Sequence, residues 1–247
     1  MVFSRGLDSK ERIIRRQIGS WLVEEVVLVS SPVWKYVRKS DKILPFTAGN
    51  SLLLDEESWY SITPQDLADR ISMGISDLLG DKLVVLDLFA GVGGNSISLL
   101  KFGFEVEAVE YDYQKVKYLR HNISEVCGMD VKAKLWHDDV FGRELVGKLR
   151  SKYDVVVASP PWGGVDYKDM SDLEMINACR LFELEEIYES KADLRVYIIP
   201  RQIRVEVLQG LFECQVWPGY SFGRVVAHIL VTGDKYDQFV LLSNDIS

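Results

Sequence analysis

The chain has 247 residues, of which 47% are hydrophobic, and a formal net charge of −8 at pH 7. This length and apolar content are enough for one substantial folded domain with an extension, and they exclude global disorder. The acidic balance argues against a protein that grips long nucleic acid by general electrostatic attraction, but not against one that reads a short phosphate-bearing end with a few local cations.

The first 81 residues are expected to form a helical N-terminal extension, distinct from the rest of the chain, 82–247. Within residues 9–29, apolar side chains recur at three- and four-residue steps, which predicts a helix. A second helix is expected to begin at Thr63 and Pro64, because threonine is a good N-cap and proline suits the first helical position.

From residue 82 on, strand and helix patterns alternate. The first strands are almost continuously apolar, as expected for a parallel sheet covered on both faces. We predict an α/β, doubly wound, Rossmann-like domain, with the last two strands as an antiparallel pair and residues 239–242 extending or capping that edge. Strands are predicted over 83–89, 105–110, 132–136, 153–158, 195–199, 213–217 and 225–232. Helices are predicted over 95–102, 113–127, 141–149, 171–190 and 203–208.

The first of these strands ends in a glycine turn, in the sequence VVLDLFAGVGGNSISLL. Gly91 and Gly93 let the backbone turn tightly and approach a ligand without a Cβ in the way. The third glycine of the dinucleotide fingerprint is absent, because Ser96 stands in its place. Asp87, at the strand end, would repel a pyrophosphate but would suit a ligand with an amino group.

Two more carboxylates follow the next two strands. Glu110 comes 19 residues after Gly91, where an acid accepts hydrogen bonds from ribose hydroxyls. Asp139 follows the third strand and could accept from an adenine amino group. A ligand that presents an amine, a ribose and an adenine along three strand ends is S-adenosylmethionine. The alternative is that each acid is an ordinary polar residue at a strand end.

The fourth strand runs into Ser-Pro-Pro-Trp-Gly-Gly, which should face the same crevice. An exocyclic amine on a base is a poor nucleophile, because its lone pair is delocalised into the ring. Ser159 Oγ and the Pro160 carbonyl could accept its two hydrogens, and proline adds rigidity without a competing donor. Trp162 offers a platform that attracts a cationic base, such as 7-methylguanine, more than a neutral one. The alternative is a turn whose tryptophan packs into the core.

Arg201 follows the fifth strand on the crevice side, and Arg204 lies close behind it. Either could meet a phosphate or pair with a surface acid, and Arg201 is the better candidate because it lies nearer the strand end. The cysteines and histidines lack metal-ligand spacing, so no metal site is expected. No apolar run is long enough to cross a bilayer, so we expect a soluble intracellular protein without membrane association. The oligomeric state is open, with a monomer favoured.

Three segments, DLFAGVGGN, SPPWGGVDY and SWYSITPQDLA, together resemble the trimethylguanosine synthase family, the RNA cap guanine-N2 methyltransferases. The resemblance runs from about Trp34 to the end of the sheet domain. It implies a Rossmann-like class I methyltransferase whose N-terminal part helps to close the site. It also implies methyl transfer from S-adenosyl-L-methionine to N2 of the 7-methylguanosine cap of an RNA, giving 2,7-dimethyl- or 2,2,7-trimethylguanosine. The family-based location is the nucleus, with the cytoplasm as a second possibility.

The resemblance also implies a role for each motif residue. The set for the cofactor is Asp87, Gly91 and Gly93 at the methionine end, Glu110 on the ribose, Asp139 on the adenine, and Thr63 and Ser159 beside them. The set for the cap is Tyr60 along its side, Ser159 and Pro160 on the amine, Trp162 on the base, and Tyr167 and Arg201 on the phosphates. One departure concerns a lysine expected shortly before Trp59, where this chain reads SLLLDEE.

Three other functions are weighed against this one. An amino-methyltransferase acting on adenine N6 or on ribosomal RNA guanine N2 would be indifferent to 7-methylation of its acceptor. A cap-binding protein without turnover is disfavoured by the intact acids and the intact Ser-Pro pair. A nicotinamide dehydrogenase is disfavoured by the missing third glycine and by Asp87.

Overall fold

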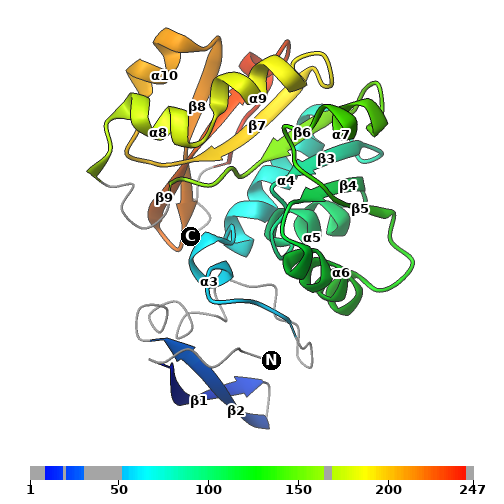
Figure 1. Ribbon diagram of the computed structural model, residues 1–247, viewed down its shortest axis with the longest axis vertical. Coiled ribbons are helices and arrows are strands. Elements are labelled where there is room, and N and C mark those ends of the chain that lie inside the picture. The colour runs from blue at the N-terminus through cyan, green and yellow to red at the C-terminus, as the bar shows by residue number, and fades with distance from the viewer. Residues whose placement is uncertain (1–8, 19–20, 31–51, 164–168, 243–247) are drawn as a thin grey trace.

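The computed structural model describes residues 9–18, 21–30, 52–163 and 169–242 (Figure 1). Seven strands form its larger sheet: β3 (Val84–Leu88), β4 (Glu105–Glu110), β5 (Ala133–His137), β6 (Val155–Ala158), β7 (Leu194–Ile199), β8 (Cys214–Ser221) and β9 (Arg224–Thr232). Their order is β5-β4-β3-β6-β7-β9-β8. The first five in this order are parallel, and β9 is antiparallel to both of its neighbours. The predicted α/β sheet is therefore confirmed, with β9 inserted between β7 and β8.

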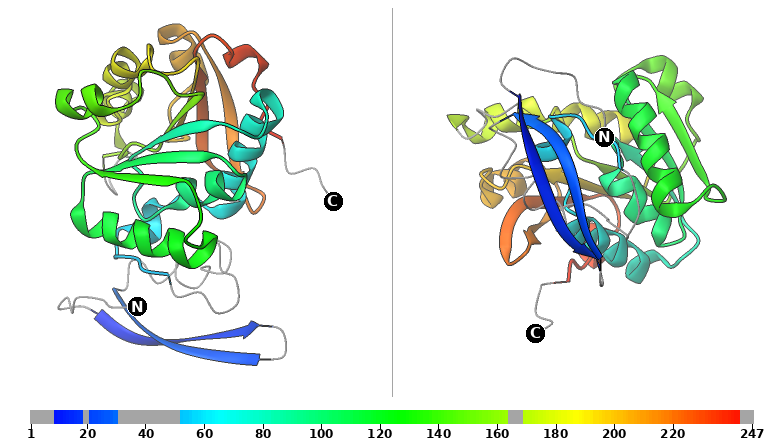
Figure 2. Two further views of the ribbon diagram at one scale, coloured as in Figure 1. Left: turned by 90° about the vertical axis from the view of Figure 1, so that its right-hand side faces the viewer. Right: turned by 90° about the horizontal axis from the view of Figure 1, so that it is seen from below.

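Helices cover both faces of the sheet (Figure 2). On one face α4 (Gln65–Leu79), α5 (Gly94–Lys101) and α6 (Tyr113–Cys127) share a hydrophobic cluster with the inner residues of β3, β4 and β6. On the other face α7 (Arg143–Lys148), α8 (Asp172–Ala178), α9 (Leu181–Tyr188) and α10 (Val205–Leu211) form a second cluster. Two cores thus enclose the strands, as their apolar sequences require.

The central strands are the most apolar part of the chain. In β6, Val155, Val156 and Val157 are each 0% exposed, and Val155 and Val157 face one cluster while Val156 faces the other. Full burial of a valine side chain stabilises a fold by about 2 kcal/mol. These strands form a rigid base, and the polar residues at their carboxyl ends are held in fixed positions.

The predicted helix over residues 9–29 is wrong. An antiparallel hairpin of β1 (Ser9–Ile18) and β2 (Trp21–Ser30) stands in its place, with Ile18 paired with Trp21. The segment is rich in isoleucine and valine, whose branched side chains favour an extended backbone, and Gly-Ser between the strands is a dipeptide typical of hairpin connections. In the described part of the extension, helix is limited to α3 (Ser58–Ser61) and α4. The division into 1–81 and 82–247 stays a prediction.

The predicted helix over residues 171–190 is two helices, α8 and α9. Arg180 separates them with a φ of 51°, in the left-handed region, and ends the first helical run. Its guanidinium lies 3.3 Å from the centre of the Phe141 ring and its Nε donates to Glu183 at 2.7 Å. These two contacts hold Arg180 in a conformation that a continuous helix excludes, and they were not visible in the helical pattern.

The start of α4 also differs from the prediction. Pro64, not Thr63, is the N-cap, because the backbone at Pro64 is extended (ψ 141°) and its carbonyl accepts from Leu67 and Ala68 at 3.0 Å. Thr63 lies instead against the first residue of α5: a Cβ on Gly94 would come within 3.0 Å of the Thr63 carbonyl oxygen. The segment before α4 is therefore fixed by tertiary contact and not by helix capping.

Residues 239–242 form no strand. Phe239 is 0% exposed and belongs to the same cluster as α4, where a Cβ on Gly74 would lie 2.7 Å from the Val240 carbonyl oxygen and 3.0 Å from the Phe239 ring. The close approach of backbone and ring is possible because residue 74 is glycine. The end of the described chain therefore covers α4 and does not extend the sheet.

Candidate active site

The polar ends of three neighbouring strands meet at one edge of the sheet. The backbone N–H of Ser159, after β6, donates to the Leu88 carbonyl of β3 at 3.3 Å. On the other side of β3, Ala90 N–H donates to the Val109 carbonyl of β4 at 3.0 Å. The glycine turn, the acidic end of β4 and the Ser-Pro-Pro-Trp segment are therefore adjacent, at the position where doubly wound sheets bind ligands.

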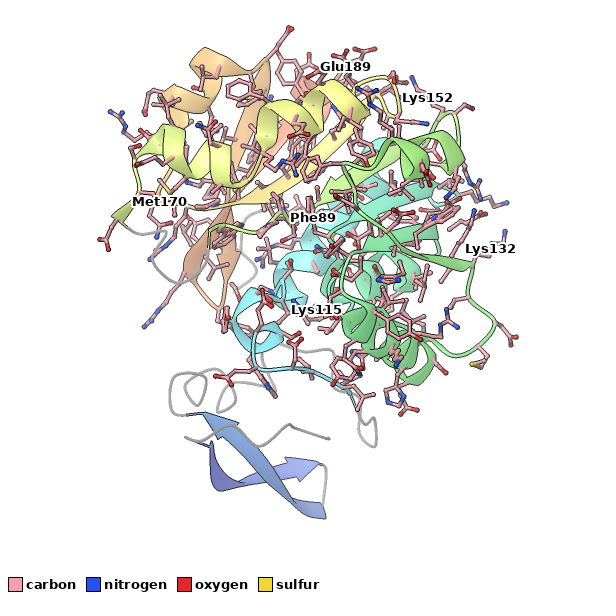
Figure 3. The ribbon with its side chains drawn as sticks, in the orientation of Figure 1. Phe89, Lys115, Lys132, Lys152, Met170 and Glu189 are labelled. Atoms are coloured by element: carbon pink, nitrogen blue, oxygen red, sulfur yellow. The ribbon has the colours of Figure 1, made fainter. Side chains whose placement is uncertain are left out.

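The glycine turn connects β3 to α5. Gly91 has a φ of 55° and Gly93 a φ of 108°, so both adopt the left-handed conformations that glycine tolerates best. A Cβ on Gly93 would lie 2.9 Å from Leu119 of α6, whereas one on Gly91 would meet nothing closer than the Phe89 carbonyl oxygen at 4.0 Å. Gly93 thus allows helix packing, and Gly91 leaves open space beside the turn. Figure 3 shows Phe89 at this end of β3.

Asp87 is fully buried beneath the turn. Its Oδ2 accepts from Ser96 Oγ at 2.5 Å, but Oδ1 has no hydrogen-bond partner among the described residues. Burial raises the pKa of this carboxyl to about 7, and the nearby charge of Glu110 adds to the rise. Such an unpaired acceptor is costly unless a donor binds it. Asn95 Oδ1, at the start of α5, is likewise buried and unpaired within the described structure.

Both unpaired oxygens are acceptors, so the group that suits them is a donor. The ammonium of a methionine moiety carries three N–H bonds and a positive charge, so it would suit an unpaired acceptor such as Asp87 Oδ1 and favour the ionised form of that carboxyl. These acceptor oxygens therefore fit the methionine end of S-adenosylmethionine. It would not suit a phosphate, which offers only acceptors and negative charge.

Glu110 connects the turn to the next strand. Its Oε2 accepts from Gly91 N–H and its Oε1 from Asp112 N–H, both at 2.8 Å. Each carboxylate oxygen has a second lone pair, so both remain able to accept from ribose hydroxyls. Asp112 in turn caps α6 by accepting from Gln114 and Lys115 N–H at 2.7 and 3.1 Å. Asp139 is exposed after β5, and its Oδ1 accepts from Phe141 N–H at 3.0 Å.

The Ser-Pro-Pro-Trp segment lies across β6 and β7. Ser159 is half-buried and Pro160 is buried. Trp162 is also half-buried: its indole N–H donates to the Ile198 carbonyl of β7 at 3.2 Å, and its ring contacts both hydrophobic clusters. The tryptophan is therefore anchored by one edge to the sheet and is less exposed than the sequence suggested.

A strap formed by residues 52–63 lies against the glycine turn. Asn122 of α6 is 2% exposed and links the two: its Nδ2 donates to the Leu53 and Val92 carbonyls at 2.9 Å, and its Oδ1 accepts from Leu53 N–H at 2.8 Å. Lys115 adds an ion pair to Glu57 of 2.7 Å, and Figure 3 shows Lys115 beside α3. No local pattern in the sequence predicts this role for Asn122, because its partners lie far away in the chain.

The remaining predicted site residues differ in their surroundings. Tyr60, on α3, is 43% exposed, and burial of the rest of the ring raises the pKa of its hydroxyl. Arg201 is exposed, and its Nη1 donates to the Val225 carbonyl of β9 at 3.1 Å. Arg204 pairs with Asp172 at 2.6 Å, the surface pairing weighed as its alternative. Tyr167 lies outside the described residues.

Two further features concern what the described part of the chain contains. It holds no group of three or more histidine, cysteine, aspartate or glutamate residues placed to bind a metal ion. None of its helices is long and apolar enough to span a membrane.

Comparison with known proteins identifies the family. Residues 82–228 match the family described as RNA cap guanine-N2 methyltransferase, which is more than half of the chain. The trimethylguanosine synthase of Schizosaccharomyces pombe is 28% identical over 160 residues, 63% of this chain and 65% of that protein. That of Saccharomyces cerevisiae is 29% identical over 153 residues, 60% of this chain and 47% of that protein. The aligned parts are less than two thirds of either relative.

Solved structures agree with the fold. A human methyltransferase 10 domain containing protein has a TM-score of 0.56 at 15% identity, covering 79% of this chain and 91% of that chain. A hypothetical protein of Thermus thermophilus has a TM-score of 0.55 at 20% identity, covering 78% and 98%. The matched family uses S-adenosylmethionine as its methyl donor, which agrees with the unpaired acceptor oxygen of Asp87. This chain belongs to the RNA cap guanine-N2 methyltransferase family.

Proposed function

We propose that the protein transfers a methyl group from S-adenosylmethionine to N2 of the 7-methylguanosine cap of an RNA, giving 2,7-dimethyl- or 2,2,7-trimethylguanosine. The observation that carries the proposal is the contact between Ser159 N–H and the Leu88 carbonyl. It brings the amine-binding segment next to the strand whose end holds Asp87. The donor and acceptor sites would therefore lie side by side at this edge of the sheet.

The cofactor side rests on four residues. Asp87 would accept from the ammonium, Glu110 would accept from the ribose hydroxyls, and Gly91 leaves the space through which the cofactor approaches the turn. Thr63 would reach the methionine end from the strap, because it lies against Gly94. Bound there, the cofactor supplies an electrophilic methyl group on a sulfonium. The role of Asp139 toward the adenine stays a prediction.

The acceptor side rests on Ser159, Pro160 and Trp162. Ser159 Oγ and the Pro160 carbonyl would accept the two hydrogens of N2 and aim its lone pair at the methyl carbon. Trp162 would stack on the base, and its bond to the Ile198 carbonyl fixes the plane of the indole before the base arrives. A fixed ring loses little conformational freedom on binding, which favours affinity.

The proposed reaction is a direct displacement. Ser159 and Pro160 would hold N2 in line with the methyl group, bound S-adenosylmethionine would supply that group, and S-adenosylhomocysteine would be the leaving product. The amine becomes acidic as it gains the methyl group, so its proton can pass through the Ser159 hydroxyl to water without a strong base. Proximity and orientation supply most of the acceleration.

The cap phosphates require cations. Arg201 is exposed and lies beyond the end of β7, close to the edge that carries Trp162, so it is the candidate of this chain for a phosphate contact. Tyr167 is a second candidate from the sequence. The partner is then the capped end of an RNA, and the family suggests the nucleus as the place of action, with a monomer as the expected form.

The test is an acceptor panel with labelled S-adenosylmethionine: GTP, GDP, 7-methyl-GTP, 7-methyl-GDP and an adenine-containing oligonucleotide. Label on N2 of the 7-methylated nucleotides alone supports the proposal. Label on the oligonucleotide, or equal label on GTP and 7-methyl-GTP, would contradict it and favour an enzyme for another base. A Ser159→Ala variant that still binds S-adenosylhomocysteine should lose transfer.

A further inference from the structure

The hairpin of β8 and β9 extends past the edge of the sheet that carries the site. Ile199, the last residue of β7, pairs with His228, and β9 begins four residues earlier, at Arg224. At about 3.3 Å per residue, the tip lies roughly 13 Å beyond that pair. Figure 1 shows this tip on the same side of the sheet as α3.

The tip presents an aromatic ring on an unfavourable backbone. Ser221 pairs with Arg224, so Phe222 and Gly223 form the turn, with φ values of 48° and 73°. Asparagine or glycine usually occupies the first of these positions, because a bulky side chain at positive φ is strained. Phe222 is 52% exposed, so about half of its surface is open to a ligand.

Two hydrogen bonds from the hairpin to α4 hold the turn in this shape. Asp66, in the first turn of α4, accepts from Ser221 Oγ at 2.8 Å and from Phe222 N–H at 3.0 Å. The start of α4 is thereby tied to the tip of the hairpin. Strained residues that are held in place by their surroundings concentrate at functional sites.

The tip lies farther along β9 than the predicted cap site. Trp162 donates to the Ile198 carbonyl, and Ile198 pairs with Ile229 of β9. Arg201 contacts the same strand at Val225, next to the tip. Along this edge the order is thus Trp162, Arg201 and then the exposed pair Phe222 and Arg224.

We propose that Phe222 is a stacking platform for the nucleotide that follows the cap, with Arg224 and Arg201 contacting the connecting phosphates. The inference rests on the proposed function and names the substrate more narrowly: capped RNA and not the free cap nucleotide. An exposed aromatic ring close to arginines is an arrangement that can bind single-stranded RNA by stacking and charge, without reading a base sequence.

The test compares 7-methyl-GTP with the dinucleotide 7-methyl-GpppA, which adds one base. For Phe222→Ala we expect kcat/KM on the dinucleotide to fall by about 5- to 100-fold, the effect of losing one stacked base. On 7-methyl-GTP the same variant should change kcat/KM by less than about twofold, because that acceptor has no second base to stack.

Three further variants separate the ring from the turn. Phe222→Asn removes the ring but suits the positive φ. Its kcat/KM on the dinucleotide should therefore fall as it does in Phe222→Ala, while the variant remains as stable as the parent protein. Phe222→Tyr should restore the activity on the dinucleotide. Phe182→Ala is the control: it removes another exposed aromatic ring, which stacks on Phe212 before β8 at the opposite edge of the sheet. It should leave kcat/KM unchanged on both acceptors.

The outcomes are distinct. If the parent protein methylates neither 7-methylated acceptor, the proposed function fails and this inference with it. If the parent methylates both and Phe222→Asn keeps full activity on the dinucleotide, the stacking role alone is overturned. Equal losses on both acceptors would mean that Phe222 only shapes the site, which would also contradict the stacking role.

Discussion

Gly91 N–H donates to Glu110 Oε2 at 2.8 Å, so the glycine turn after β3 and the acidic end of β4 form one unit. A cofactor whose hydroxyls donate to Glu110 would leave the hydrogen bond between Gly91 and Glu110 intact, so it would bind without disturbing the turn. The same carboxylate shapes the loop and, in the proposed function, would also meet the ligand.

Replacing Glu110 with Gln should weaken S-adenosylhomocysteine binding by at least about tenfold, because one acceptor becomes a donor that faces Gly91 or the ribose. Calorimetry measures this. Glu105→Gln is a matched control on the same strand, where the side chain pairs with Arg150 at the other end. Equal loss in both variants would show that the effect is a general weakening of β4.

Asp87 should make stability and cofactor binding depend on pH. Its pKa is raised from 3.8 to about 7 in the folded protein. An acid of this kind binds more protons in the folded than in the unfolded state, so the free energy of unfolding falls as pH rises from about 4 to 7 and is level above that. The fall attributable to Asp87 is about 4 kcal/mol at most. Asp87→Asn should remove it in denaturant titrations across this range.

Binding should change in the opposite direction. A ligand ammonium favours the ionised carboxylate, so the affinity for S-adenosylhomocysteine should rise between pH 5.5 and 7.5 by up to about tenfold per pH unit below the pKa of Asp87. Calorimetry at several pH values checks this. An affinity that is flat with pH in the parent protein, or equally steep in Asp87→Asn, would contradict an ammonium contact at Asp87.

Asn122 should couple the strap to the glycine turn. Asn122→Ala leaves the Leu53 and Val92 carbonyls and the Leu53 N–H without their partner, which should destabilise the protein by about 2–4 kcal/mol. It should also raise the hydrogen exchange of residues 52–63, and bound S-adenosylhomocysteine should reduce that exchange. Loss of stability with unchanged exchange in the strap would mean that Asn122 does not position it.

Two glycines in helices should respond oppositely to alanine. Gly74→Ala places a Cβ 2.7 Å from the Val240 carbonyl oxygen and should destabilise the protein by about 1–3 kcal/mol. Gly147→Ala in α7 meets no atom within 4 Å and should be stabilising by up to about 1 kcal/mol. Thermal unfolding compares the two. A neutral Gly74→Ala would mean that the chain end at Phe239 is only loosely packed on α4.

The sequence predicted the parts of the fold that depend on local pattern. The bounds of β4 and α6 agree with prediction, because local signals mark both: valine and alanine alternate with glutamate along β4, and Asp112 stands at the N-cap of α6. The hairpin of β1 and β2 was predicted as a helix, since isoleucine and valine also recurred at helical spacing there. The insertion of β9 between β7 and β8 could not be predicted, because strand order is set by long-range packing.

The candidate site shows the same contrast between local sequence patterns, which can be predicted, and long-range contacts, which cannot. Asp87, Glu110 and Ser159 lie at strand ends as their motifs predicted, and their roles stay predictions. Asn122 was missed because its bonds join residues 30 and 69 positions apart, and no local pattern records such contacts. The bond from Trp162 to the Ile198 carbonyl, which partly buries the ring, likewise depends on which strand lies next to β6.

The most direct test of the cap assignment is the ratio of kcat/KM for 7-methyl-GTP to that for GTP. In the parent protein this ratio should be at least about 10, because the cationic ring of 7-methylguanine is attracted to the indole face of Trp162. Trp162→Ala should bring the ratio near one while S-adenosylhomocysteine still binds, and Trp162→Phe, which keeps a ring but loses the bond to Ile198, should lie between. A parent protein that methylates GTP as efficiently as 7-methyl-GTP would contradict the account.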